Sequence, residues 1–223
     1  MMFGNNSEEE HNYWISYTDL VMGLLMAFIV VSMVLFSRDS EQAALDGKYR
    51  ELSEVFEIAF SELEGIEVTD DATVTFVLED TSKKELFPSG KYHPTDYMLK
   101  LLRDFVPVYY EELYKIFSMA SDTFIIKEIR IEGHTDSDDS YYNNLKLSAL
   151  RAGKIQDHMR YDNAFTAYPQ NFQDYVRYNS VVCGYSETRL LDEDGNYVFE
   201  TGCPEDKDRS RRVEFRTILE YKK

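Results

Sequence analysis

Residues 129–152 read IRIEGHTDSDDSYYNNLKLSALRA, and this stretch decides the fold of the second part of the chain. It continues a run of strand-forming residues that begins at Phe124, and we therefore expect a strand over residues 124–132. A short polar loop follows, and the apolar spacing then changes to that of a helix over residues 143–161. The stretch predicts a strand, a loop and a helix in direct succession.

The polar residues of this stretch form a candidate binding site. Asn144, Ser148 and Arg151 lie at positions i, i+4 and i+7, so they share one helix face, with Leu147 beside them. Asp136 follows the strand, at the edge of the predicted sheet. A carboxylate and a guanidinium on opposite sides of a cleft suit a zwitterionic ligand, because each binds the opposite charge. The alternative is an ordinary Asp–Arg salt bridge that holds the helix on the sheet.

The flanking sequence extends the same alternation of strands and helices. Further strands are expected over residues 72–78, 180–185 and 212–219, and a helix bent at Pro107 over residues 95–117. Residues 162–178 and 191–207 read as loops or insertions. The predicted fold class is α+β: a single N-terminal transmembrane helix, a juxtamembrane helix, and an α/β sandwich with helices on one face of the sheet.

Four motifs in this order resemble the signature of OmpA-like peptidoglycan-binding domains. They are GHTD after a strand, NNLKLSALRA on a helix, VVCGYSETR, and DRSRRVEF in the last strand. The resemblance covers residues 72–219, and Ser210 stands where the family has asparagine. It implies a domain that binds peptidoglycan, with Asp136 on the ammonium of diaminopimelate and Arg151 on one of its carboxylates.

The resemblance also assigns roles to neighbouring residues. It implies that Asn144 and Leu147 line the binding groove, and that Thr135 and the backbone beside it contribute hydrogen bonds. Ser148, on the same helix face, belongs to the same predicted site. The predicted peptidoglycan-binding residues are thus Thr135, Asp136, Asn144, Leu147, Ser148 and Arg151.

Residues 20–36 read LVMGLLMAFIVVSMVLF, without a charge or a proline. A helix of this length spans about 26 Å, and the preceding residues extend it to the roughly 30 Å of a bilayer core. A signal peptide is disfavoured, because the residues before the run are acidic and no small-residue cleavage site follows it. We expect a short N-terminus (1–13), a transmembrane helix (14–37), a helical linker (38–65) and the peptidoglycan-binding domain (66–223).

Asp19 lies at the start of this apolar run, where a carboxylate is energetically costly. One interpretation is that Asp19, with Thr18, caps a helix at the level of the lipid headgroups. The other is that its carboxylate faces a partner helix, where desolvation raises its pKa enough for it to take up and release protons. Gly23 and the neighbouring methionines would allow other helices to pack closely on that face.

The motif Y-x-D-L-x-x-x-L-x-x-x-F around Asp19, followed by an OmpA-like domain, is narrower than either feature alone. It resembles MotB-type stator subunits of ion-driven rotary motors and, together with MFGN near the start of the chain, the MotB-like subunits of Zorya anti-phage defence systems. The resemblance implies a homodimer inside a ring of multi-spanning ZorA- or MotA-like subunits, with Asp19 carrying the coupling ion, H+ or Na+. A flagellar motility stator and a passive cell-wall tether are the alternatives.

The orientation in the membrane receives two opposite indications. No Lys or Arg precedes the apolar run, whereas Arg38, Lys48 and Arg50 follow it, and this bias by itself favours an N-terminus outside the cytoplasm. The family resemblance implies the reverse: an inner-membrane protein with a cytoplasmic N-terminus and a periplasmic C-terminal domain. We expect the second arrangement, because large domains translocate regardless of flanking charge.

The helical linker carries an apolar stripe at heptad spacing. It consists of Leu45, Tyr49, Leu52, Phe56, Ala59 and Leu63, and Gly65 then reads as a helix C-cap. The stripe either pairs with a second chain or packs on the domain that follows, and packing within the chain is the commoner outcome for so short a stripe.

Composition excludes several classes of function. The chain has 24 Lys and Arg against 41 Asp and Glu, a net charge of −17, so direct nucleic-acid binding is not expected.

The cysteines and histidines give no sign of a metal site or of catalysis. Cys183 and Cys203 match no zinc-binding spacing and are either a disulfide pair or two thiols. His134 reads as a buried, hydrogen-bonded residue without a metal-binding set. No nucleophile–base pair is evident, so we expect neither an enzyme nor a cofactor.

Overall fold

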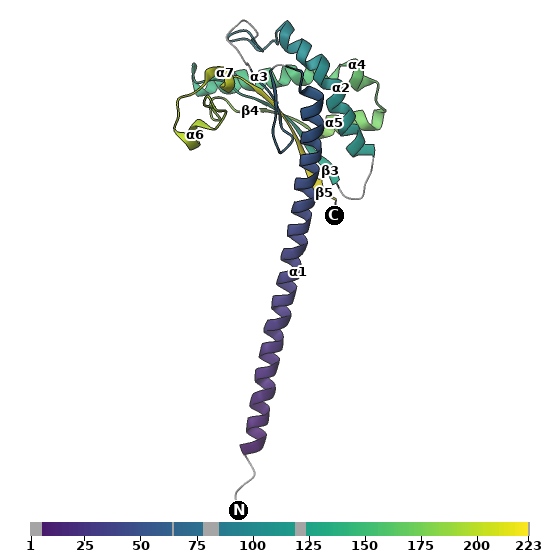
Figure 1. Ribbon diagram of the computed structural model, residues 1–223, viewed down its shortest axis with the longest axis vertical. Coiled ribbons are helices and arrows are strands. Elements are labelled where there is room, and N and C mark those ends of the chain that lie inside the picture. The colour runs from purple at the N-terminus through teal and green to yellow at the C-terminus, as the bar shows by residue number, and fades with distance from the viewer. Residues whose placement is uncertain (1–5, 64, 78–84, 119–123, 223) are drawn as a thin grey trace, which may run out of the picture. The chain divides into compact units, whose positions relative to one another are not determined.

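The computed structural model describes residues 6–63, 65–77, 85–118 and 124–222. The chain divides into two compact units, Met1–Ala44 and Leu45–Lys223. Helix α1 (Asn6–Phe60) contains residues of both units (Figure 1). It therefore runs without interruption through residue 37, where the transmembrane segment is expected to end. It also ends before Gly65, so the predicted C-cap is wrong: Gly65 has a φ of +85° and instead leads into the first strand.

The side chains in the apolar part of α1 are exposed among the residues that the structure describes. All side chains of residues 20–36 are exposed, including Phe28 at 69% and Phe36 at 77%. Among the described helices, α1 is the one long and apolar enough to cross a membrane, with a mean hydropathy of 2.6 in its most apolar window. An apolar surface of this extent needs a cover of lipid or of partner helices.

The second unit is built on a five-stranded sheet of order β1-β2-β5-β3-β4. Strands β3 and β4 are parallel, and the remaining neighbours pair antiparallel. The strands are β1 (Ile66–Val68), β2 (Val74–Phe76), β3 (Phe124–Gly133), β4 (Ser180–Gly184) and β5 (Val213–Tyr221). The parallel pair requires a crossover connection, and the helices between β3 and β4 supply it.

The helices of the second unit are two long and four short ones. They are α2 (Asp96–Ser118), α3 (Tyr141–Arg160), α4 (Asn163–Thr166), α5 (Gln170–Asn179), α6 (Val198–Thr201) and α7 (Lys207–Ser210). Pro107 lies inside α2, which continues through it. This arrangement confirms the predicted fold class, an α+β protein with an apolar N-terminal helix and a C-terminal sheet domain.

Aromatic side chains from three directions form the core. Phe105 of α2 lies 5.2 Å from Phe76 of β2 and 4.7 Å from Phe215 of β5, measured between ring centroids. Phe56 of α1 lies 5.8 Å from Tyr109 of α2. The core therefore joins the sheet to α2 and to the last turns of α1 in one apolar cluster.

The heptad stripe packs within the chain, as expected for so short a stripe. Leu52 and Phe56 are buried in the core of the second unit, although Ala59 is exposed. The hydroxyl of Tyr49 accepts a hydrogen bond of 2.8 Å from the backbone nitrogen of Leu219 in β5. The stripe therefore packs on the second unit of its own chain and does not form an exposed dimer interface.

The prediction that residues 162–178 form a loop is wrong. They contain α4 and α5, whose Phe165 and Phe172 are fully buried. Phe165 stacks on Tyr110 of α2 at 4.6 Å between centroids, and Phe172 contacts Tyr114 at 5.1 Å. These contacts with α2 explain why a segment with Pro169 and several Asn and Asp residues becomes helical: tertiary packing outweighs weak local propensity.

Candidate binding site at the end of strand β3

The second unit contains a pocket of 480 Å³ where β3 ends. Its walls come from a loop before α2, the loop after β3, the first half of α3, and Arg211, which lies shortly before β5. The lining residues are Glu85, Leu86, Phe87, Ser89, Gly90, Thr135, Asp136, Asp138, Asp139, Asn144, Leu147, Arg151 and Arg211. Five of the six predicted peptidoglycan-binding residues are among them.

Close packing of α3 on the sheet brings these residues to the pocket. Gly133 of β3 and Gly184 of β4 are direct partners in the parallel register. A Cβ at Gly133 would lie 2.2 Å from the backbone oxygen of Ser148, and one at Gly184 would lie 2.6 Å from the backbone nitrogen of Ala149. Only glycine leaves room for the helix at both positions, so this glycine pair sets the depth at which α3 sits.

Asn144 fixes the shape of the loop that follows β3. Its buried Nδ2 donates to the backbone oxygens of Asp136 (3.0 Å) and Asp139 (3.1 Å) and to Oε2 of Glu187 (3.0 Å). The backbone nitrogen of Thr135 donates to the oxygen of Ser186 at 3.1 Å. The loop is therefore tied both to α3 and to the segment after β4, which limits the positions that the Asp136 side chain can take.

The carboxylate of Asp136 is held by two donors of the protein. Its Oδ2 accepts a hydrogen bond of 2.8 Å from Nη1 of Arg211, and its Oδ1 accepts one of 3.3 Å from the backbone nitrogen of Asp138. Nη2 of Arg211 is paired with Asp208. Each carboxylate oxygen has two lone pairs, so Asp136 keeps acceptor capacity for a ligand.

Arg151 is oriented through its Nε and the face of its guanidinium. Nε donates to the backbone oxygen of Lys91 at 3.0 Å, and the guanidinium carbon lies 5.0 Å from the ring centroid of Phe87. Burial lowers the pKa of Arg151 to about 10; the charge of Asp136 partly opposes this shift and that of Arg211 adds to it. Arg151 remains cationic at neutral pH, with its two Nη groups left to face the pocket.

The alternative of a closing salt bridge between Asp136 and Arg151 does not hold for the described residues. The ion-pair partner of Asp136 is Arg211, and no described carboxylate lies within ion-pair distance of Arg151. The two predicted groups therefore line one pocket without neutralising each other directly. This is the arrangement that a zwitterionic ligand requires.

Of the remaining predicted residues, Leu147 and Thr135 line the pocket, whereas Ser148 lies behind its wall. Leu147 lines the pocket as an apolar residue, and the hydroxyl oxygen of Thr135 is buried without a hydrogen-bond partner among the described residues. Ser148 is fully buried behind the wall. Its Oγ donates to the oxygen of Leu145 and accepts from the backbone nitrogen of Ser186 at 3.1 Å. Ser148 therefore holds α3 in place and is not part of the pocket surface.

Sequence reasoning missed Arg211, Phe87 and Lys91. The last two precede the GHTD motif by more than 40 residues in the printed sequence, and no local pattern links them to it. Arg211 stands in DRSRRVEF, a motif that the sequence does single out. Its position directly before the last strand, which neighbours β3, was the available signal.

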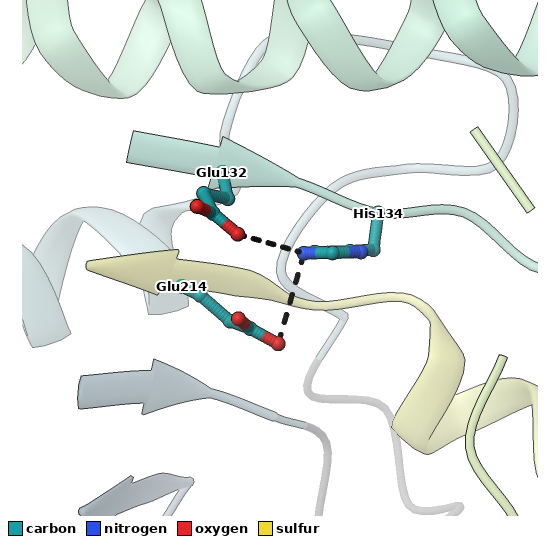
Figure 2. A group of neighbouring side chains, drawn as sticks. All are labelled: Glu132, His134 and Glu214. Carbon is teal, nitrogen blue, oxygen red and sulfur yellow. Dashed lines mark ion pairs between the residues drawn. The ribbon is translucent and has the colours of Figure 1, made fainter. Parts of the chain in front are cut away.

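Beside the pocket, His134 belongs to a second, buried group of charged side chains (Figure 2). Its Nε2 lies 4.0 Å from Oε2 of Glu132 and 3.7 Å from Oε1 of Glu214, and the two glutamates are direct partners on β3 and β5. Tyr185 stacks on the imidazole at 5.1 Å. His134 is buried, as predicted, but neither ring nitrogen has a hydrogen-bond partner among the described residues, so the hydrogen-bonding part of that interpretation is wrong.

Three arginines compensate the two glutamates of this group. Arg212 Nε lies 2.7 Å from Glu214, Arg189 Nη1 lies 3.3 Å from Glu132, and Arg216 lies 3.8 Å from Glu132 and 3.5 Å from Glu214. Burial first, and then these three guanidiniums, hold the pKa of His134 well below its usual range. The imidazole is therefore neutral.

The ligand atoms of Glu132, His134 and Glu214 lie within 4.8 Å of one another, which is close enough to enclose a metal ion. The charge balance argues against one. Three guanidiniums already pair with the two carboxylates, and Arg216 also pairs with Asp71 at 3.6 Å, so a cation would have to compete with them for the same oxygens. The group fits better as a buried ion-pair network that supports the strands and the loop beside the pocket.

Asp19 lies well inside α1. Because the helix begins at Asn6, the interpretation of Asp19 and Thr18 as a helix cap is wrong. The hydroxyl of Thr18 instead donates to the backbone oxygen of Trp14, one turn earlier, at 2.8 Å. Asp19 is exposed on the helix at the start of the apolar run, and no described residue pairs with its carboxylate.

Cys183 and Cys203 are both free thiols in the structure. Cys183 lies half-buried in β4, and Cys203 is exposed after α6. Of the two alternatives left by the sequence, the structure has the unpaired one.

Comparison with known proteins places the chain near one named group. No family model matches it. It is similar to Zorya protein ZorB of Escherichia coli strain ATCC 8739, with 27% identity over 95% of this chain and 89% of the relative. A second ZorB, from E. coli O139:H28 strain E24377A, is 28% identical over 68% of this chain and 65% of its own length. The expected similarity to a MotB-like Zorya subunit is confirmed.

Solved structures with a similar arrangement share little sequence with the chain. A protein described as MotB-like from Desulfovibrio vulgaris aligns with a TM-score of 0.49 and 19% identity, over 80% of this chain and 94% of its own. The cell wall anchor of the type VI secretion system from Pseudomonas aeruginosa aligns with a TM-score of 0.46 and 19% identity, over 77% of this chain and 99% of its own.

Proposed function

We propose that this protein is a peptidoglycan-anchored stator subunit of an ion-driven membrane motor that acts in anti-phage defence. It has no enzymatic role in this proposal. The observation that carries it is the pocket, in which Asp136 and Arg151 lie on the same lining without an ion pair between them. Diaminopimelate, the diamino acid of many bacterial cell walls, has an ammonium and a carboxylate on one carbon, and these two groups complement Asp136 and Arg151.

The pocket supports this ligand in three ways. Arg151 presents its Nη groups in a partly desolvated place, where a bidentate bond to a carboxylate is strong. Asp136 is held in position yet keeps lone pairs for an ammonium. Leu147 gives an apolar surface for the methylene chain between the two ends of diaminopimelate.

The anchor function is tested by sedimenting the full-length protein in detergent with purified cell-wall sacculi. Arg151→Ala should lower the affinity by at least about tenfold, because a buried charge-assisted bond to a carboxylate is lost. Lys146→Ala, which removes an exposed cation from the same helix, serves as the matched control and should bind like the parent. Equal binding by the Arg151 variant and the parent would refute the anchor function.

The motor part of the proposal rests on Asp19 and the apolar face around it. An exposed carboxylate on an otherwise apolar helix requires partner helices, and we propose that two copies of this chain lie inside a ring of ZorA- or MotA-like subunits. H+ would cross by way of Asp19, with Na+ as the other candidate. Moving one charge across the membrane supplies about 2.3 kcal/mol per 100 mV, and the anchored wall would resist the resulting torque.

The proposed orientation places the N-terminus in the cytoplasm and the second unit in the periplasm of the inner membrane, where peptidoglycan is accessible. A C-terminal reporter enzyme that folds only in the periplasm should be active. Activity of a cytoplasm-only reporter at the same position would contradict the whole arrangement.

The defence role is favoured over flagellar motility by the similarity to two proteins named Zorya protein ZorB. Deleting the gene should raise the number of phage plaques and leave swimming unchanged. Loss of swimming with normal phage resistance would instead identify a motility stator.

A further inference from the structure

Two guanidiniums of the pocket share one buried carboxylate. Arg151 and Arg211 both line the pocket, and Asp136 interacts with both. Arg211 is also paired with Asp208, whereas no described carboxylate lies within ion-pair distance of Arg151. A single zwitterionic centre brings one carboxylate, which can meet only one of the two guanidiniums.

The remaining acidic residues of the pocket are Glu85, Asp138 and Asp139. Asp138 is paired with Lys207. Asp139 accepts hydrogen bonds from the backbone nitrogen of Ser140 and from Asn143 at 3.0 Å, at the start of α3. All three are exposed, so water screens their charges, whereas Asp136 and Arg151 are buried.

Arg211 has donors to spare for a ligand. One N–H of its Nη1 binds Asp136 and one of its Nη2 binds Asp208, out of five N–H groups on the guanidinium. Its side chain is 37% exposed, so the remaining donors are accessible from the pocket. Burial is the main cause of the lowered pKa of Arg151, and the nearby charge of Arg211 lowers it further.

We propose that Arg211 binds a second carboxylate, so that the pocket takes a ligand end with one ammonium and two carboxylates. This inference rests on the proposed binding of diaminopimelate. In a peptidoglycan stem peptide that ends at diaminopimelate, its second carboxylate is free. In a stem that continues to another residue, the same carboxylate is tied up in an amide bond. The pocket therefore selects stems that end at diaminopimelate.

The test uses two small probes that differ only at this group. One is meso-diaminopimelate acetylated on one nitrogen, which has one ammonium and two carboxylates. The other is the same compound with the carboxylate beside the acetylated nitrogen converted to a carboxamide. Binding of each to the full-length protein in detergent is measured by titration calorimetry. The parent should bind the dicarboxylate about tenfold more tightly, the gain of a charge-assisted bond.

Arg211→Gln should remove this preference, so that the variant binds the two probes with equal affinity. Arg211→Lys, which keeps the charge but not the planar fork, should retain part of the preference. Arg209→Gln is the matched control, because Arg209 lies two residues away and pairs with Glu67 at 3.0 Å outside the pocket. It should keep the full preference, and it also shows whether a change in this segment harms folding.

The outcomes separate this inference from the function on which it rests. If the parent binds both probes equally well, the second carboxylate is not recognised and the inference fails while the anchor function stands. If Arg211→Gln weakens both probes alike, Arg211 only orients Asp136; if it tightens both, Arg211 masks Asp136. Either result overturns the inference. If the parent binds neither probe, diaminopimelate binding itself is refuted.

Discussion

Asp19 and Asp136 are two aspartates at predicted functional positions, and the chain surrounds them in opposite ways. Asp19 is exposed on an apolar helix, and no described residue pairs with it. Asp136 is mostly buried and receives hydrogen bonds from Arg211 and from the backbone of Asp138. A carboxylate that the protein itself satisfies is ready for a small ligand. A carboxylate without a described partner, among exposed apolar side chains, fits the proposal that other chains cover this helix.

The largest effect that this contrast predicts is a complete loss of the proposed motor function in Asp19→Asn. Amide and carboxylate have the same shape, so packing and sacculus binding should be unchanged, while phage protection and ion flux should disappear. Asp19→Glu keeps the charge and should retain part of the activity. Phage protection at parental level by Asp19→Asn would make the protein a passive cell-wall tether.

The next effect concerns how the site around Asp136 is built. Gly133→Ala should destabilise the second unit by about 3 kcal/mol, because the added methyl group overlaps the backbone of α3 at Ser148. Gly153→Ala is the control: no atom lies within 4 Å of its Cβ position, and alanine favours the helix by about 1 kcal/mol. The unfolding free energies of both variants are measured by urea unfolding of the full chain in detergent, monitored by the near-UV circular dichroism of the tyrosines. Equal stability of the two variants would contradict the close approach.

A smaller effect is expected from the buried charged group around His134: it should make the stability of the second unit depend on pH. The pKa of His134 is depressed in the folded state, so below about pH 6.5 the unfolded chain binds a proton that the folded chain does not. Stability should therefore fall as the pH decreases from 7 to 5, by up to about 1.4 kcal/mol per pH unit. His134→Asn should flatten this dependence, and the exposed His158→Asn should not. Parallel curves for the parent and His134→Asn would exclude His134 as the titrating group.

The smallest predicted effect tests the packing of the last turns of α1 within the second unit. Tyr49→Phe removes the acceptor for the backbone nitrogen of Leu219 and should cost about 1 kcal/mol of unfolding free energy. Tyr161→Phe, at a side chain that is 77% exposed, should cost nothing measurable. Hydrogen exchange at the Leu219 amide gives a local readout, and it should become faster only in Tyr49→Phe.

The extent to which the site could be predicted differs from residue to residue. Asp136, Asn144, Leu147 and Arg151 all line the pocket, because a strand and the helix after it bring them together through local periodicity, and their binding role stays a prediction. Ser148 has the same periodicity and yet points into the packing behind the wall. Which residues of one helix face remain accessible depends on how deeply the helix sits, and the glycine pair on β3 and β4 sets that depth.

Long-range partners could not be predicted. Asp136 and Arg211 are 75 residues apart in the chain, and Arg151 and Lys91 are 60 apart. The helices α4 and α5 were missed for a related reason: their buried aromatic rings pack on α2, which lies some 50 residues earlier in the printed sequence.

By itself, the amino-acid sequence determined the apolar run with its aspartate, the alternation of strands and helices, and the polar face of the helix after β3. Periodicity and hydropathy are properties of neighbouring residues, so they need no fold to be read. Only the tertiary structure decided which guanidinium meets Asp136, which serine is buried and which histidine is enclosed by charges. Ion pairs and burial depend on distances in space, and these are set when distant parts of the chain pack together.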